Sequence, residues 1–119
     1  MKISIITVTL NSEKTIRDTL NSVISQTYKK IEHIIVDGGS NDETIKILKK
    51  YKNNKSKFFI KKNFGIYKSI NYGIKKSSGD YICILNSDDI FQSNNIIQNL
   101  AKIFSKNKKI DIFLGNVAY

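Results

Sequence analysis

Two patterns of apolar and polar residues alternate along the chain. Continuous apolar runs rich in β-branched residues are typical of buried strands, and they occupy residues 2–10, 31–37, 57–61, 81–85 and 110–115. Between the runs, apolar residues recur every three or four positions, which predicts helices with one buried face. These helical stretches are 13–26, 40–51, the region from Ile66 to the sequence SSGD, and the region from Ile96 to Phe104.

Polar residues at the predicted boundaries suit helix starts and turns. Asn11 and Ser12 are candidate caps for the first helix. Ser40 and Glu43 have the spacing of a capping box for the second helix. Proline is absent, so turns rest on Gly, Asn and Ser.

The alternation of strands and helices predicts an α/β fold with a mostly parallel sheet and flanking helices. Consecutive parallel strands are then joined by right-handed crossovers. The chain has no internal repeat or linker, so we expect residues 1–119 to form one domain.

Three polar clusters follow three of the predicted strands. Thr9 and Asn11 follow the first strand, residues 37–42 the second, and residues 86–89 the fourth. Because ligands of open parallel sheets bind beyond the carboxyl ends of the strands, we expect these clusters to converge on one site.

The adjacent carboxylates of Asp88 and Asp89 are the first candidate site residues. Mg²⁺ and Mn²⁺ prefer carboxylate oxygens, and Mg²⁺ is often shared between one or two carboxylates and a substrate's phosphates. The alternative is that Asp88 caps the following loop and Asp89 points to solvent, since Asp is common in turns.

The segment around Asp37 is the second candidate. Asp37 ends a strand, where its carboxylate could bind a base or ribose, and Gly38 permits close approach of the backbone to a ligand. The alternative is an ordinary capped turn between strand and helix.

The third candidate is the stretch 63–81. Gly65 and Asn71 could line a pocket there, and Lys61, Lys62 and Lys68 could face phosphates. The alternative is that Ile66, Ile70 and Ile74 are buried core and the lysines form a solvated face. We expect His33 and Cys83, each within an apolar strand, to be structural.

A net charge of +10 raises the question of nucleic-acid binding. The lysines are spread over many segments and Arg17 is the only arginine, so we expect no nucleic-acid partner. Attraction to an anionic membrane surface fits the charge better. No apolar run approaches the length of a membrane span and no signal peptide is evident, so we expect a cytoplasmic location.

Three motifs resemble the family 2 glycosyltransferases of the GT-A fold, and especially members that build bacterial surface polysaccharides. They are SIITVTLNSEKTI, IEHIIVDGGSNDET and GIYKSINYGIKKSSGDYICILNSDD, in the family's order and spacing. The resemblance implies a UDP- or dTDP-linked sugar donor, a divalent metal (Mn²⁺ or Mg²⁺) on its diphosphate, and inverting transfer to a saccharide or lipid-linked acceptor. Oligomeric state does not follow from it.

The resemblance also implies roles for individual residues. The segment from Thr7 to Asn11 would form the first-strand wall around the nucleobase, and Asp37 and Gly38 would lie in the base-binding turn. Asp88 would contact the nucleotide, and Asp88 and Asp89 would hold the metal. Asn71 is a further candidate for the nucleotide site.

The chain departs from the family in several places. Gly38 stands where many relatives have a second Asp, Asn86 replaces the first acid of a strict Asp-X-Asp, and Lys68 replaces an Asp. Asp111 is the only acid after Asp89, so no residue is assigned as catalytic base. We therefore expect a donor-binding part that is truncated relative to the family.

Other protein classes fit less well. A response-regulator receiver domain needs an acidic pair after its first strand, where this chain has TLNSE. A dinucleotide-binding domain needs G-x-G-x-x-G there, which is missing. A non-catalytic nucleotide-binding fragment and a basic nucleic-acid-binding module remain the alternatives.

Overall fold

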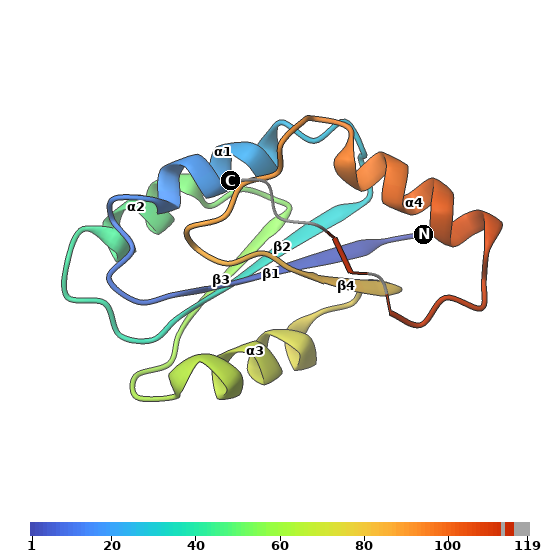
Figure 1. The fold of residues 1–119 in the computed structure, drawn as a ribbon. Helices are drawn as coiled ribbons and strands as arrows, with labels where there is room; N and C mark the ends of the chain where they lie inside the picture. Colours follow the sequence, from blue (N-terminus) through green and yellow to red (C-terminus); the bar gives the residue numbers. More distant parts are fainter. Residues whose placement is uncertain (113, 116–119) are drawn as a thin grey trace.

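A computed structural model describes residues 1–112 and 114–115, which form one sheet with helices on both faces (Figure 1). The strands are β1 (Ile3–Thr9), β2 (Ile31–Asp37), β3 (Ser56–Ile60) and β4 (Tyr81–Ile84). The helices are α1 (Ile16–Ile24), α2 (Thr44–Tyr51), α3 (Gly65–Lys76) and α4 (Ile96–Lys106). All neighbouring strands are parallel in the order β3-β2-β1-β4, which confirms the predicted α/β class.

The strand register brings three loops to one edge of the sheet. Thr9 pairs with Asp37 where β1 and β2 end, and Ile6 pairs with Ile84 where β4 ends. Because the strands are parallel, the loops that follow β1, β2 and β4 all leave from this carboxyl edge. The three polar clusters therefore lie at the same edge of the sheet, as the sequence predicted.

The two faces of the sheet are covered unequally. Helices α1, α2 and α4 lie over one face, and α3 lies alone on the other (Figure 1). The inner strands carry most of the core, which includes the fully buried residues Ile3, Ile5, Ile6, Ile34, Ile35 and Val36. Within the described residues, no helix is long and apolar enough to cross a membrane.

Helix α3 packs on the sheet through small residues. Ser69 and Gly73 are its buried residues, whereas Ile66 and Ile74 are 52% and 41% exposed. A Cβ atom built on Gly73 would lie 2.8 Å from Ile6 Cγ2, so the helix lies close to β1. The expectation that Ile66 and Ile74 are buried core is wrong: Ser69 and Gly73 make the buried contact with the sheet, and Ile66 lines the open pocket at the start of α3.

The predicted helix starts are also corrected. Helix α2 begins at Thr44, because the Ser40 hydroxyl donates to Asp37 Oδ1 instead of capping the helix. Asp42 accepts the Thr44 N–H at 2.9 Å. The capping box of Ser40 and Glu43 therefore does not form.

Helix α1 begins at Ile16, three residues later than predicted. Asn11 adopts a positive φ of 50°, which is a turn conformation rather than a helix cap. The Ser12 carbonyl accepts the N–H groups of Thr15 and Ile16. Neither Asn11 nor Ser12 is the cap, because Thr15 stands at that position.

The last predicted strand, 110–115, is wrong for the residues that are described. Residues 110–112 and 114–115 are not in a strand, and Phe113 lies outside the described residues. The Ile110 N–H donates to the Asn107 carbonyl and closes a turn, and Ile112 and Leu114 are 80% and 86% exposed. Asp111 is likewise exposed, so it does not face a core.

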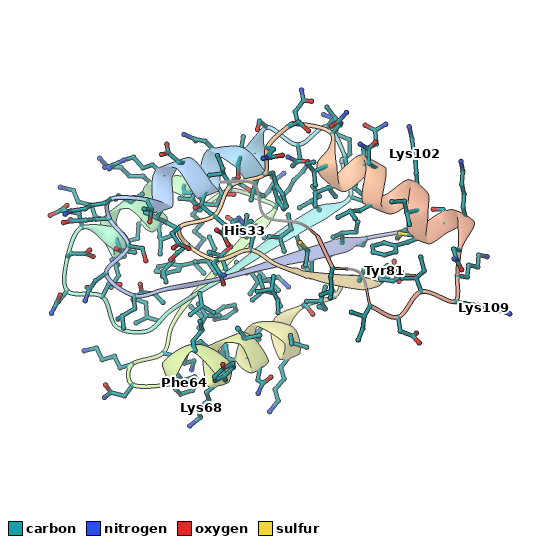
Figure 2. All side chains as sticks on the ribbon, viewed as in Figure 1. His33, Phe64, Lys68, Tyr81, Lys102 and Lys109 are labelled. Atoms are coloured by element: carbon teal, nitrogen blue, oxygen red, sulfur yellow. The ribbon has the colours of Figure 1, made fainter. Side chains whose placement is uncertain are left out.

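His33 lies inside the molecule, between β2 and the helices above it (Figure 2). Its ring nitrogens form hydrogen bonds with Thr7 Oγ1 at 2.8 Å and with the Tyr51 hydroxyl at 2.9 Å. Burial lowers the pKa of His33 to about 3, so the ring is neutral at physiological pH. The structural role expected for His33 agrees with these contacts.

Cys83 is also unreactive, since burial raises the pKa of its thiol to about 11. It lies half-buried in β4. Its neighbour Tyr81 stacks on Phe104 of α4 with 4.2 Å between ring centroids, which fixes β4 against that helix. Tyr81 is labelled beside α4 in Figure 2.

Candidate functional site

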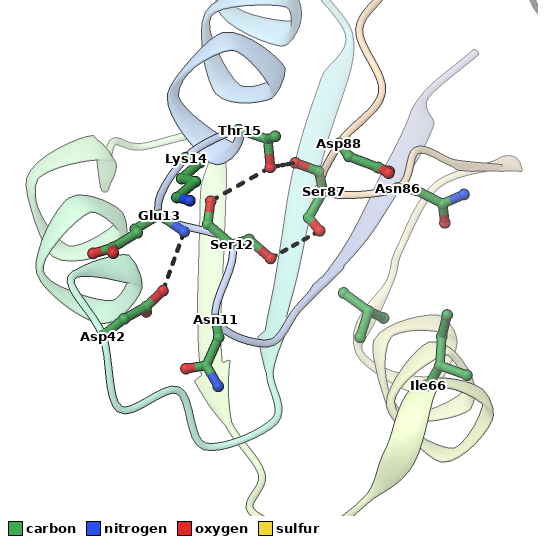
Figure 3. A pocket seen from close by; sticks show the side chains of 11 residues that line it. Asn11, Ser12, Glu13, Lys14, Thr15, Asp42, Ile66, Asn86, Ser87 and Asp88 are labelled. Carbon is green, nitrogen blue, oxygen red and sulfur yellow. Dashed lines mark hydrogen bonds between the residues drawn. The ribbon is translucent and has the colours of Figure 1, made fainter.

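An open pocket of about 610 Å³ lies at the carboxyl edge of the sheet (Figure 3). It receives side chains from the loop after β1, the loop after β2, the loop after β4 and the start of α3. Its lining residues are Val8, Asn11, Ser12, Glu13, Lys14, Thr15, Asp42, Ile66, Asn86, Ser87 and Asp88.

Asn11 joins the first two loops. Its N–H donates to Ser40 Oγ at 2.8 Å, and its side-chain Oδ1 accepts the N–H of Asn41 at 2.9 Å. Asn tolerates the positive φ found here better than most residues, since its short polar side chain bonds to nearby backbone. The loop after β1 is thus fixed against the loop after β2.

Asp37 is buried beneath these loops, and both of its oxygens accept hydrogen bonds. Oδ1 accepts from the hydroxyls of Thr9 and Ser40, at 2.7 and 2.6 Å. Oδ2 accepts the N–H groups of Gly39 and Ser40, at 2.9 and 2.7 Å. A buried carboxylate needs such partners. Asp37 therefore shapes the turn 38–40 and is not itself exposed.

Gly38 and Gly39 complete this turn. The Gly38 N–H donates to the Thr9 carbonyl at 2.8 Å, and the Gly38 Cα faces Leu10 with room for ordinary contact. Gly39 has a φ of +96°, which a side chain would disfavour. The backbone requirement for glycine lies at Gly39, whereas a Cβ atom at Gly38 would make ordinary contacts with Leu10 and the Thr9 carbonyl.

Glu13 and Asp42 link the same two loops from the pocket side. The Glu13 N–H donates to Asp42 Oδ2 at 3.3 Å, and the Glu43 N–H donates to Glu13 Oε2 at 3.0 Å. Desolvation acts to raise the pKa of Asp42, but the hydrogen bonds from Thr44 and Glu13 outweigh it and hold that pKa below its usual value. Asp42 thus stays ionised, and the hydrogen bonds of both side chains help to hold the loops.

The segment after β4 presents one of its two aspartates to the pocket. Asp88 lines the pocket, whereas Asp89 is outside the lining set (Figure 3). The Ser12 hydroxyl donates to Ser87 Oγ at 2.9 Å, which joins this segment to the loop after β1. Among the described residues, neither the Asp88 nor the Asp89 carboxylate accepts a hydrogen bond, so Asp88 does not cap the loop.

This pair fits a metal site that a ligand completes. Within the described part of the chain, no three His, Cys, Asp or Glu side chains gather as a metal-binding group. An all-protein metal site is therefore absent there, but Mg²⁺ commonly binds one or two carboxylates together with substrate phosphates. Asp88 meets that smaller requirement from the pocket wall, and the adjacent Asp89 carboxylate is likewise not engaged by other described residues but lies outside the lining.

The third candidate segment contributes less than expected. Ile66 of α3 lines the pocket, but Asn71 is exposed on α3 and does not. Lys61 and Lys68 also lie outside the lining, with ammonium groups 4.7 and 4.5 Å from the ring centroids of Tyr72 and Phe64. Figure 2 shows Lys68 beside Phe64 at α3.

Asp42 and Ser87 belong to the polar clusters that were expected to converge, whereas three other lining residues were not among the sequence candidates: Glu13, Lys14 and Thr15. Each lies within a few residues of a candidate, on the same loops. Their position directly after a predicted strand could have identified them, since side chains in such loops lie at the carboxyl edge of the sheet. Lys14 supplies the basic side chain of the lining.

Comparison with known proteins places these features in a family. Residues 4–119 match the family model described as glycosyl transferase family 2. The chain is 33% identical over 116 residues to poly-beta-1,6-N-acetyl-D-glucosamine synthase of Staphylococcus epidermidis, covering 96% of this chain and 28% of that protein.

Solved structures agree on the fold. TarS of S. aureus, in complex with UDP-GlcNAc, matches with a TM-score of 0.84 and 30% identity, over 91% of this chain and 32% of that one. The mannosyltransferase PcManGT of Pyrobaculum calidifontis, in complex with GDP-Man and Mn²⁺, matches with a TM-score of 0.81 and 19% identity, over 87% and 32%. The chain thus spans about a third of each of these two crystallised chains, of which the TarS chain comprises residues 1–349.

Proposed function

The chain belongs to glycosyl transferase family 2, and on that premise we propose that it binds a nucleoside-diphosphate sugar, of the UDP or dTDP type, in the pocket at the carboxyl edge. It forms the donor-binding part of a glycosyltransferase with the GT-A fold. The protein in the TarS structure binds UDP-GlcNAc. UDP-GlcNAc is therefore the first donor to test.

The observation that carries the proposal is the meeting of three loops around one pocket. Asn11, Asp42 and Asp88 come from the loops after β1, β2 and β4, and all three line it. Its volume, about 610 Å³, is in the range of small-molecule and cofactor sites. Ligands of open parallel sheets bind at this edge.

The base and ribose of the nucleotide would bind at the loops after β1 and β2. The hydrogen bond between Thr9 and Asp37 would set the position of the turn 38–40. Gly38, which has no side chain, would let the nucleobase approach the turn beside Leu10. Asn11 would contact the nucleoside from the pocket wall. Base recognition then rests on backbone groups and Asn11 more than on the buried Asp37 carboxylate.

The diphosphate would lie between Asp88 and the start of α1. We propose that Asp88 and Asp89 hold Mn²⁺ or Mg²⁺, which offsets the charge on the departing diphosphate when bound. The structure of PcManGT, which contains Mn²⁺, supports this choice of ion for the fold. Lys14, on the pocket wall, would add a second positive charge near the phosphates.

The reaction proposed is inverting transfer of the sugar to a saccharide or lipid-linked acceptor during polysaccharide synthesis. The name of the S. epidermidis relative, a polysaccharide synthase, supports the acceptor class. The general base is left unassigned, because Asp88, Asp42 and Glu13 have other tasks in the pocket. The net charge of +10 supports a cytoplasmic protein at the inner face of the membrane.

A panel of nucleotides tests the donor class. UDP, UDP-GlcNAc, dTDP and GDP are titrated calorimetrically into the folded protein with Mn²⁺ present. We expect UDP or dTDP compounds to bind at least tenfold more tightly than GDP. Failure of every nucleoside diphosphate to bind would overturn the proposed function, and preference for GDP would overturn the pyrimidine assignment. Co-sedimentation with anionic vesicles in a salt series tests the membrane contact.

A further inference from the structure

The segment that contains Asp88 and Asp89 has little regular structure of its own. Residues 85–95 lie between β4 and α4, outside any strand or helix. The Leu85 N–H bonds to the Ile6 carbonyl at one end, and the Asn94 carbonyl accepts the Thr27 N–H at the other. The position of the two aspartates between these ends therefore depends on contacts with other parts of the chain.

One side of α1 provides those contacts. Thr15, Thr19, Ser22 and Gln26 follow one another at helical spacing, and each bonds to the segment after β4; we name these four residues the α1 polar row. The Ser22 hydroxyl oxygen accepts the Phe91 N–H at 3.2 Å. Gln26 donates to the Ser93 carbonyl at 2.7 Å and accepts the Ile97 N–H at the start of α4.

The two threonines of the row bracket Asp88. The hydroxyls of Thr15 and Thr19 both lie 2.9 Å from the Ser87 carbonyl oxygen. The Thr19 hydroxyl also lies 2.7 Å from the Asp89 carbonyl oxygen. A hydroxyl can donate only one proton. Because the Thr15 hydroxyl can donate to the Ser87 carbonyl, the Thr19 hydroxyl is available to donate to the Asp89 carbonyl. The backbone is thereby held on both sides of Asp88.

We propose that Thr19 is a positioning residue for the Asp88–Asp89 pair, and that it acts by fixing the backbone that presents their carboxylates. Thr19 is fully buried, so its hydroxyl does not exchange these carbonyl partners for water. The claim that this backbone position affects metal affinity rests on the proposed function. The claim that Thr19 fixes the backbone position is independent of the proposed function.

The test uses two threonine variants of the whole chain and two readouts. Thr19→Val keeps the shape and removes the donor, while Thr19→Ser keeps the donor. The first readout is amide hydrogen exchange without ligand. We expect the Asp89 amide, which donates to the Asn86 carbonyl, to exchange at least fivefold faster in Thr19→Val, with amides of β1 and β2 unchanged and Thr19→Ser close to wild type.

The second readout is the Kd for UDP in the presence of Mn²⁺. Partners that orient metal ligands commonly change metal affinity about 10- to 100-fold when removed, so we expect about a tenfold weaker Kd in Thr19→Val. Thr27→Val is the matched control, because Thr27 is exposed and its hydroxyl bonds to Gln98 of α4 instead of the loop. It should change neither readout.

The outcomes separate the two claims. Exchange at Asp89 that is unchanged in Thr19→Val, or not restored by Thr19→Ser, would overturn the positioning role. Faster exchange together with a wild type that binds no UDP would leave the positioning role standing and overturn the proposed function. If Thr19→Val does not fold, Thr19→Ala removes the same hydroxyl with a smaller side chain and is judged by the same exchange at the Asp89 amide.

Discussion

The Thr9 hydroxyl donates a 2.7 Å hydrogen bond to Oδ1 of Asp37, directly across the parallel pairing of β1 and β2. The contact lies at the last pair of the two strands and is fully buried. It ties the ends of two strands together at the point where the loops of the pocket begin.

Asp37→Asn tests this arrangement. An amide nitrogen facing the Gly39 and Ser40 N–H groups would lose both bonds, and one facing the two hydroxyls would require each hydroxyl to accept instead of donate. In either orientation the charge-assisted hydrogen bonds to the carboxylate are lost. We expect the free energy of unfolding to fall by about 1–3 kcal/mol, measured by urea denaturation. Asp18→Asn, at an exposed position on α1, is the control and should change stability little. Equal effects of the two substitutions would contradict the structural role of Asp37.

His33 predicts a pH dependence of stability. Its pKa is about 3 in the folded chain and 6.5 in the unfolded chain, so the unfolded state binds more protons below pH 6.5. Stability is therefore full above pH 6.5 and falls as the pH decreases toward 3, by up to about 1.4 kcal/mol per pH unit. Urea denaturation between pH 7 and 5 measures this slope.

Glu32 titrates at lower pH than His33, so it contributes little to the slope of stability between pH 7 and 5. Burial acts to raise the pKa of Glu32, but hydrogen bonds from Ser4, Ser78 and Lys2 outweigh it and bring the pKa from 4.5 to about 2. Its contribution is present above pH 4.5 and is lost as the pH falls toward 2. A His33→Gln variant should lack the slope between pH 7 and 5, and retention of the slope would contradict the assignment to His33.

Gly73→Ala tests the packing of α3. The added Cβ would lie 2.8 Å from Ile6 Cγ2 in the close contact between α3 and β1. Overpacking costs about 1–3 kcal/mol, which we expect to outweigh the gain of about 1 kcal/mol in helix propensity. The melting temperature should fall. Lys75→Ala, exposed on the same helix, should leave it nearly unchanged. A more stable Gly73→Ala variant would show that the helix is free to move outward.

The sequence pattern predicted the strands and the edge at which the site lies, because continuous apolar runs and parallel pairing leave few arrangements. It did not predict how α3 packs. Periodicity shows which residues share a helix face, but the contact through Ser69 and Gly73 depends on close approach to Ile6. For the described residues 110–112 and 114–115, the predicted strand failed because an apolar run forms a strand only where it pairs with a neighbouring strand.

The α1 polar row was missed for a related reason. Thr19 and Gln26 lie within the predicted helix 13–26, and the apolar spacing of that stretch indicates no partner for polar residues. In the structure both are buried against the segment after β4. Hydropathy alone does not distinguish a polar side chain that faces water from one that bonds to another loop's backbone.

The central claim is that Asp88 helps to bind a metal that holds a nucleoside diphosphate. Calorimetric titration of UDP, with Mn²⁺ and with EDTA, tests it most directly in wild type and Asp88→Ala. Asp18→Ala is a matched control on an exposed acid away from the pocket. The account predicts that Mn²⁺ strengthens UDP binding at least tenfold in wild type and in Asp18→Ala, and has no effect in Asp88→Ala. Equal affinity with Mn²⁺ and EDTA in the wild type, or a full Mn²⁺ effect in Asp88→Ala, would contradict it.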